Sequence, residues 1–107
     1  EEGINNLEEI AKAPGIDGFY IGPSDLAIAL GITPGPDMQD DPRHIEACRK
    51  VLDVANATGL VPCHHGTPGP EGAIRRFKEG FKMAQLGSDI GYVRAGASAA
   101  LDAVARS

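Results

Sequence analysis

The chain has no tryptophan, few aromatic residues and only two cysteines, and each scarcity excludes a class of protein. Of its 107 residues, 5% are aromatic but 42% are hydrophobic, so the chain has the composition of a globular protein and is too apolar for a disordered one. Cys48 and Cys63 lack a Cys-x-x-Cys spacing and are too few for a secreted disulfide scaffold. Free, mostly buried thiols are therefore expected.

Basic residues are in the minority, and long apolar runs are absent. The chain carries 15 acidic and 10 basic residues, a formal net charge of -5. A nucleic-acid surface needs clustered Lys and Arg, so no nucleic-acid partner is expected. No apolar run approaches the roughly 20 residues that span a bilayer, and the acidic first residues do not resemble a signal peptide. The sequence indicates no membrane segment and a cytoplasmic location.

The apolar residues follow strand and helix periods in alternation. Strands are predicted around 19–21, 60–65 and 81–86, and a Gly/Pro-rich loop runs from about 31 to 41. Four helices flank the strands, and in the third of them Ala73, Ile74 and Phe77 are predicted to face inward. The other three carry the following apolar residues: Ile4, Leu7, Ile10 and Ala11; Ile45, Cys48, Leu52 and Ala55; Tyr92, Val93, Ala97, Ala100, Leu101 and Val104.

Turn and capping residues support this division. Asp41-Pro42 is a typical helix start, and Gly59 and Gly80 are typical helix stops, while Pro68-Gly69-Pro70 introduces the third helix. Strands separated by helices require a parallel sheet with right-handed crossovers. The predicted fold class is therefore α/β, built from parallel βα repeats.

The segment 19–26 is the first functional candidate. A short apolar strand ends at Gly22-Pro23 and at once presents Ser24 and Asp25, and ligands collect beyond the carboxyl ends of parallel strands. The same residues have a second interpretation, because Ser and Asp are preferred helix caps. His64-His65 and Ser88-Asp89 end the other two strands, so all three pairs are expected to converge on one face.

Three segments of the chain resemble a known family. They are 15–27 (GIDGFYIGPSDLA), 57–62 (ATGLVP) and 80–89 (GFKMAQLGSD). The chain is similar to the metal-dependent, pyruvate-specific class II aldolases, which include 4-hydroxy-2-oxoheptanedioate aldolase and the 2-keto-3-deoxy sugar-acid aldolases. The resemblance implies that 1–107 is one partial domain, the C-terminal three βα units of a TIM (β/α)8 barrel. Three strands cannot close such a barrel, so a start inside a longer chain is expected.

The resemblance also implies a reaction and a set of site residues. The family cleaves 4-hydroxy-2-keto acids to pyruvate and an aldehyde, using Mg²⁺, Mn²⁺ or Co²⁺. Asp25 matches one of two metal carboxylates, and Gly22, Pro23 and Ser24 match the loop that binds the pyruvate carboxylate. The second carboxylate, the catalytic His and a keto-acid-binding Arg belong to earlier strands. No catalytic residue is therefore expected here, and the isolated chain is expected to be inactive.

The pair His64-His65 departs from the family pattern, which has Gly and aliphatic residues there. Adjacent strand residues point to opposite faces, so only one histidine can face the barrel axis. One of them, assigned as His65, is expected to contact substrate or even to bind the metal. The other is expected to pack under a helix or to bond a backbone carbonyl.

Ser88-Asp89 leaves alternative functions open. A strand-to-helix turn often binds phosphate, but Ser88 or Asp89 equally suits an N-cap. A non-catalytic anion-binding module is therefore a rival interpretation. A third is a subunit-interaction fragment, because the family exchanges its last helix between subunits and Ala95, Gly96 and Ala97 would allow close packing. A homo-oligomer through the C-terminal helix is expected.

Overall fold

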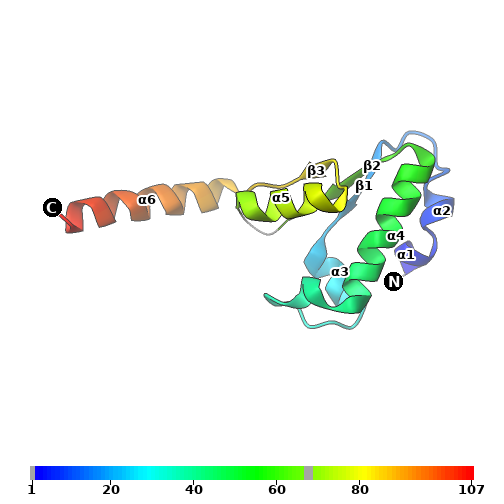
Figure 1. Cartoon of the computed structure of the whole chain (residues 1–107), viewed down its shortest axis with the longest axis horizontal. Coiled ribbons are helices and arrows are strands. Elements are labelled where there is room, and N and C mark those ends of the chain that lie inside the picture. Colours follow the sequence, from blue (N-terminus) through cyan, green and yellow to red (C-terminus); the bar gives the residue numbers. More distant parts are fainter. Residues whose placement is uncertain (1, 67–68) are drawn as a thin grey trace.

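Three parallel strands form the centre of the structure, a computed structural model that describes residues 2–66 and 69–107 (Figure 1). The sheet order is β1-β2-β3, with β1 at Gly18–Ile21, β2 at Val61–His64 and β3 at Met83–Ala84. Both pairs are parallel, with Ile21 opposite His64 and His64 opposite Ala84. This confirms the predicted α/β class. Strand β3 is much shorter than predicted because only two of its residues pair with β2.

Helices separate the strands as expected, with some additions. The helices are α1 (Glu2–Asn5), α2 (Leu7–Ile10), α3 (Pro23–Ala29), α4 (Pro42–Thr58), α5 (Pro70–Glu79) and α6 (Asp89–Ala105), with a 3-10 turn η1 at Met38–Asp40. The first predicted helix is broken into α1 and α2, and α3 and η1 occupy part of the segment between β1 and α4. Pro68, predicted to introduce α5, lies outside the described residues.

Local chemistry sets the bounds of α4. Asp41 is its N-cap, and one carboxylate oxygen accepts a hydrogen bond of 2.9 Å from the Arg43 backbone N–H. The Arg43 side chain also binds this carboxylate, and its hydrogen bonds lower the pKa of Asp41 to about 2. Gly59 ends the helix at φ 75, in the left-handed region that favours glycine. The predicted start and stop are confirmed.

The covered face of the sheet carries Ile21 and His64. Its main core cluster joins the strands to α2, α3 and α4 and consists of Leu7, Ile21, Leu26, Ala47, Cys48, Val51, Val54 and Phe81. Both cysteines are free and buried, as predicted. The other face presents Tyr20, Val61 and Met83, which are 54%, 38% and 52% exposed. The sheet is therefore covered by helices on one face only.

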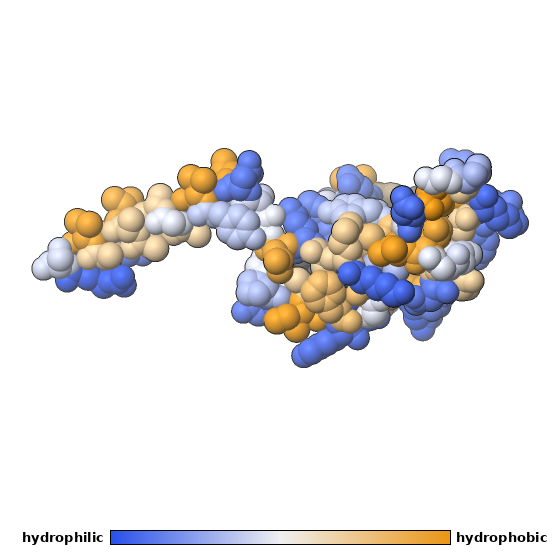
Figure 2. Space-filling model, turned by 90° about the horizontal axis from the view of Figure 1, so that it is seen from above, coloured by the Kyte–Doolittle hydropathy of each residue, from blue (hydrophilic) through white to orange (hydrophobic). Residues whose placement is uncertain are grey.

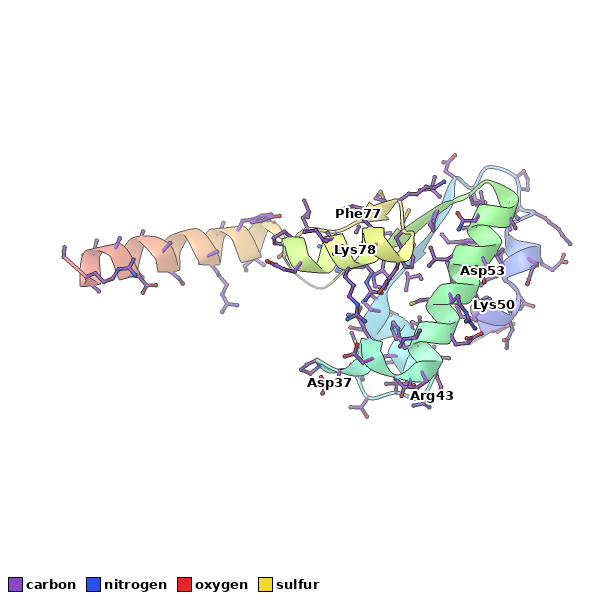
Figure 3. All side chains as sticks on the ribbon, viewed as in Figure 1. Asp37, Arg43, Lys50, Asp53, Phe77 and Lys78 are labelled. Atoms are coloured by element: carbon purple, nitrogen blue, oxygen red, sulfur yellow. The ribbon has the colours of Figure 1, made fainter. Side chains whose placement is uncertain are left out.

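Two predicted apolar faces are buried only in part. Ile45 on α4 is 50% exposed, although the rest of its predicted face is buried or half-buried. Ile74 and Phe77 on α5 are also 50% exposed, so their inward assignment was wrong; Phe77 is labelled in Figure 3. Arg76 takes the inward place on α5 instead, where it donates hydrogen bonds to Gln39 (3.0 Å) and Glu79 (2.6 Å). A buried guanidinium is tolerated because these two acceptors satisfy it. Periodicity alone could not show that pairing.

Helix α6 projects away from the rest of the molecule (Figure 1). None of its residues is buried. The radius of gyration is 16.9 Å, whereas a compact domain of this length would have about 13 Å. Within the described residues, no helix is long and apolar enough to cross a membrane. The apolar residues of α6 thus have no covering partner in the described part of this chain.

Candidate functional site

The five residues assigned to the site from the sequence line one pocket at the carboxyl end of β1. The pocket has a volume of about 360 Å³ and is lined by Tyr20, Gly22, Pro23, Ser24, Asp25 and His65. Pro23, Ser24 and His65 also line an adjoining pocket of about 280 Å³, which reaches Gln85 and Ser88. The expected convergence of the strand ends is confirmed for Ser24, His65 and Ser88.

Helix α3 presents Ser24 and Asp25 from its first turn. Its N-cap is Gly22, with Pro23 at the first helical position and no side-chain capping bond. The interpretation of Ser24 or Asp25 as the cap was therefore wrong. Pro23 fixes φ near the helical value and has no N–H, so the first backbone amide that this turn offers to the pocket is that of Ser24.

Gly22 makes room for the carboxylate of Asp25. A Cβ atom built on Gly22 would come within 2.5 Å of Asp25 Oδ2. Asp25 is exposed, and among residues 2–66 and 69–107 no salt bridge involves it. Its oxygens are thus available to a ligand beside the end of β1.

The two adjacent histidines have opposite environments. His65 is exposed at the pocket, and its Nδ1 is joined to the Tyr20 hydroxyl by a hydrogen bond of 2.7 Å. His64 is 0% exposed and packs edge-to-face on Phe81, with ring centroids 5.0 Å apart. The assignment of His65 to the pocket side therefore agrees with the geometry. His64 takes the alternative that the sequence left open, packing on the helix-covered face, and does not join the convergent strand ends.

Burial dominates the electrostatics of His64. Desolvation, helped by the positive charge of Arg76, lowers the pKa of His64 to about 4. Neither ring nitrogen has a hydrogen-bond partner among the described residues. His64 is consequently a neutral side chain at physiological pH.

Tyr20 is a pocket residue that sequence reasoning missed. It lies two residues before Gly22, so strand alternation places both on the same face, and it pairs with Cys63 of β2, two residues before His65. That alternation was a usable signal. Gln39 and Met38 also line the adjoining pocket, but they come from η1, within the segment predicted as a Gly/Pro-rich loop, where the sequence carries no comparable pattern.

Ser88 has a structural role at the third strand end. It is the N-cap of α6, and its hydroxyl accepts a hydrogen bond of 3.2 Å from the Gly91 N–H. Asp89 Oδ1 accepts from the Ile90 N–H at 2.7 Å. The capping interpretation of Ser88 is confirmed. Asp89, one residue inside the helix, lines neither pocket at the strand ends.

No complete cation site is formed by the described part of the chain. Within residues 2–66 and 69–107, no three His, Cys, Asp or Glu side chains converge in a way that could hold a metal ion. The pocket contributes one free carboxylate, that of Asp25, to any such site. Hard divalent cations take several oxygen ligands, so further ligands would have to come from outside these residues.

Known proteins include relatives of this chain. A curated relative, the 5-keto-4-deoxy-D-glucarate aldolase of Salmonella arizonae, is 39% identical over 97 residues, which are 88% of this chain and 35% of the relative. The chain therefore spans about a third of the length of the curated relatives it matches.

Solved structures show the same fold. An HpcH/HpaI aldolase/citrate lyase family protein from Burkholderia cenocepacia superimposes with a TM-score of 0.83 at 27% identity, covering 98% of this chain and 39% of that one. The citrate synthase SbnG superimposes with a TM-score of 0.74 at 27% identity, covering 98% of this chain and 41% of that one. The chain thus has part of the TIM-barrel type of fold that these proteins share. The family model described as HpcH/HpaI aldolase/citrate lyase matches residues 1–95, and the chain belongs to that family.

Proposed function

We propose that this chain is the C-terminal part of a divalent-metal-dependent aldolase that cleaves a 4-hydroxy-2-keto acid to pyruvate and an aldehyde. The observation that supports this proposal most directly is the pocket at the end of β1, which is lined by Gly22, Pro23, Ser24, Asp25 and His65. Family membership and the name of the Salmonella arizonae relative support the reaction class. The uncovered sheet face supports the barrel placement, because Tyr20 and Met83 would face the barrel interior once further strands close it.

The residues present fit one part of a metal site. Asp25 offers carboxylate oxygens that no salt bridge occupies among the described residues, and Gly22 leaves space beside them. Oxygen donors suit Mg²⁺, Mn²⁺ and Co²⁺. A divalent ion held there would supply Lewis-acid chemistry to the keto acid. This chain provides one ligand, so by itself it is proposed to be inactive.

The chain's other pocket residues bind and orient the substrate. The Ser24 N–H and hydroxyl are placed to donate to a carboxylate of the keto acid. His65 lies across the pocket, where it would contact the aldehyde portion, and the Tyr20 hydroxyl at 2.7 Å holds its ring in place. A fixed ring orientation makes this contact selective rather than adaptable. The aldehyde specificity is therefore proposed to depend on the Tyr20–His65 pair.

The function is tested in a completed barrel, defined as the Salmonella arizonae relative in which residues 1–107 replace the matching segment. Its substrate is the one that names the relative, 5-keto-4-deoxy-D-glucarate. Pyruvate release is measured with a lactate dehydrogenase coupled assay, with Mg²⁺ and again after EDTA. Release that EDTA abolishes and added Mg²⁺ restores is expected. A folded completed barrel that releases no pyruvate would refute the proposal and favour an anion-binding role, which isothermal titration with pyruvate would detect.

We also propose that α6 joins subunits of a homo-oligomer. Ile90, Val93 and Val104 are 67%, 70% and 73% exposed. Together with Ala97 and Ala100 they repeat at spacings of three and four residues, which gives a helix one apolar side. Figure 2 shows apolar side chains along one edge of the projecting helix. A helix without a covering partner in the described part of its own chain is suited to dock on a second copy.

A matched pair of substitutions tests the docking. Ala97→Glu places a charge on the apolar side of α6, and Ala95→Glu places the same charge on the opposite side. We expect Ala97→Glu to weaken association of the completed barrel by about 10-fold to 100-fold, because burying an unpaired charge costs on the order of 1–3 kcal/mol or more. Sedimentation velocity measures the assembly. Equal assembly of both variants would show that this side of α6 makes no contact.

A further inference from the structure

His44 is a buried polar side chain that contacts the backbone at the start of α3, beside the strand-end pockets. It lies in the first turn of α4, is 1% exposed, and its Nε2 is 3.1 Å from the Pro23 carbonyl oxygen. A carbonyl can only accept, so Nε2 carries the hydrogen and donates it. The Cys48 Sγ lies 3.6 Å from Nδ1, the second ring nitrogen. Both nitrogens of His44 therefore have a hydrogen-bond partner.

The carbonyl that His44 holds belongs to the first helical residue of α3. Pro23 lines both pockets at the strand ends, and Ser24 and Asp25 follow it directly. Ser24 and Asp25 are exposed, and the Ser24 hydroxyl makes only a long contact within the described part of the chain, from Oγ to Met38 Sδ at 4.0 Å. The buried hydrogen bond from α4 is therefore a strong constraint on where this turn lies.

The second buried histidine shows that burial alone does not explain the contact. His64 is fully buried as well, but its nitrogens have no partner among the described residues. His44 differs because it connects two elements, α4 and the start of α3, through a specific donor and acceptor. Such a bond constrains the position of the acceptor's backbone, whereas a histidine that only packs does not.

We propose that His44 is a positioning residue: by holding the Pro23 carbonyl, it fixes Ser24 and Asp25 where they bind the keto acid and the divalent ion. The inference rests on the proposed function, whose site it deepens. His44 touches neither ligand, so its effect passes through the backbone of Pro23. Groups that orient the residues binding a metal typically affect metal affinity or activity by about 10-fold to 100-fold.

Two substitutions in the completed barrel separate positioning from packing. His44→Leu keeps the side-chain size but removes the donor, while His44→Gln retains an N–H donor near the position of Nε2. We expect His44→Leu to raise both KM and the Mn²⁺ dissociation constant about 10-fold with kcat changed less than about 3-fold, and His44→Gln to recover most of the loss. His64→Leu, the same substitution at the other buried histidine, should leave KM unchanged.

The outcomes distinguish the inference from the function it rests on. Steady-state kinetics give KM and kcat, and Mn²⁺ binding is followed by electron paramagnetic resonance. If His44→Leu lowers kcat in proportion to the folded fraction while KM and Mn²⁺ affinity stay at wild-type values, His44 is structural only and the inference is wrong. Wild-type values throughout also overturn it. A completed barrel that folds but releases no pyruvate overturns the proposed function and this inference together.

Discussion

Asp25→Asn is expected to lower the metal-dependent kcat/KM of the completed barrel by more than about 100-fold. Loss of a residue that only orients a metal ligand typically lowers metal affinity or activity by about 10-fold to 100-fold, and loss of the ligand itself should have a larger effect. The substitution keeps one side-chain oxygen but removes the negative charge that a divalent ion requires. Asp25 is exposed in the first turn of α3, where a carboxylate contributes about 0.3–1 kcal/mol through the helix dipole, so the fold should persist. Pyruvate release and Mn²⁺ binding are the measurements.

Asp53→Asn is the matched control for this loss. Asp53 is exposed on the second half of α4, and Figure 3 shows it away from Arg43, which lies in the first turn of that helix. The substitution makes the same change of charge outside both strand-end pockets, so activity should be unchanged. Full activity of Asp25→Asn, with Mn²⁺ affinity intact, would remove Asp25 from the metal site and the proposed mechanism with it.

Acidification is expected to destabilise the protein through His64. Its pKa is lowered from 6.5 to about 4 in the folded state, by desolvation first and then by Arg76 and His44. Between these values the unfolded chain binds a proton that the folded chain does not, so stability falls as the pH falls from about 6.5 through 4. The loss at pH 4.5 is about 2–3 kcal/mol, because a pKa difference of one between the folded and unfolded chain corresponds to about 1.4 kcal/mol.

His64→Leu isolates this contribution. At neutral pH the variant should be at least as stable as wild type, because an apolar side chain replaces a buried polar one without partners among the described residues. Between pH 7.5 and 4.5, the melting temperature of the completed barrel with His64→Leu should fall about 5–10 °C less than that of the wild-type completed barrel, because a protein of more than about 150 residues changes by about 2–4 °C per kcal/mol. Circular dichroism melts of both proteins give the difference. Parallel pH profiles would show that His64 is not buried as a neutral side chain.

The Asp41 carboxylate also has a lowered pKa, but it does not affect the comparison of wild type with His64→Leu. Hydrogen bonds from Arg43 lower the pKa of Asp41 from 3.8 to about 2, so its effect on stability appears mainly below the window of His64. Asp41 is also unchanged between wild type and His64→Leu, and its contribution cancels in the difference. The comparison between pH 7.5 and 4.5 therefore reports on residue 64.

The order of helices and strands was predictable because it depends on local signals. Asp41-Pro42 and Gly59 mark both ends of α4, and the βα alternation alone requires a parallel sheet. Strand alternation likewise separates His64 from His65, so the sequence could state that only one of them faces the pocket. The register of β2 against β1, in which Ile21 and His64 lie opposite each other, was needed to establish which of the two histidines faces the pocket.

The sequence by itself determined the parallel α/β class, the strand ends that carry Ser24 and Asp25, and the family resemblance, since all three reside in short segments and their spacing. Only the tertiary structure decided the inward place of Arg76, the uncovered state of α6 and the bond from His44 to the Pro23 carbonyl. Two of these depend on partners far apart in the chain: His44 and Pro23 are 21 residues apart and Arg76 and Gln39 are 37 apart. Periodicity describes which face of an element is apolar, but pairing across elements follows from how they pack.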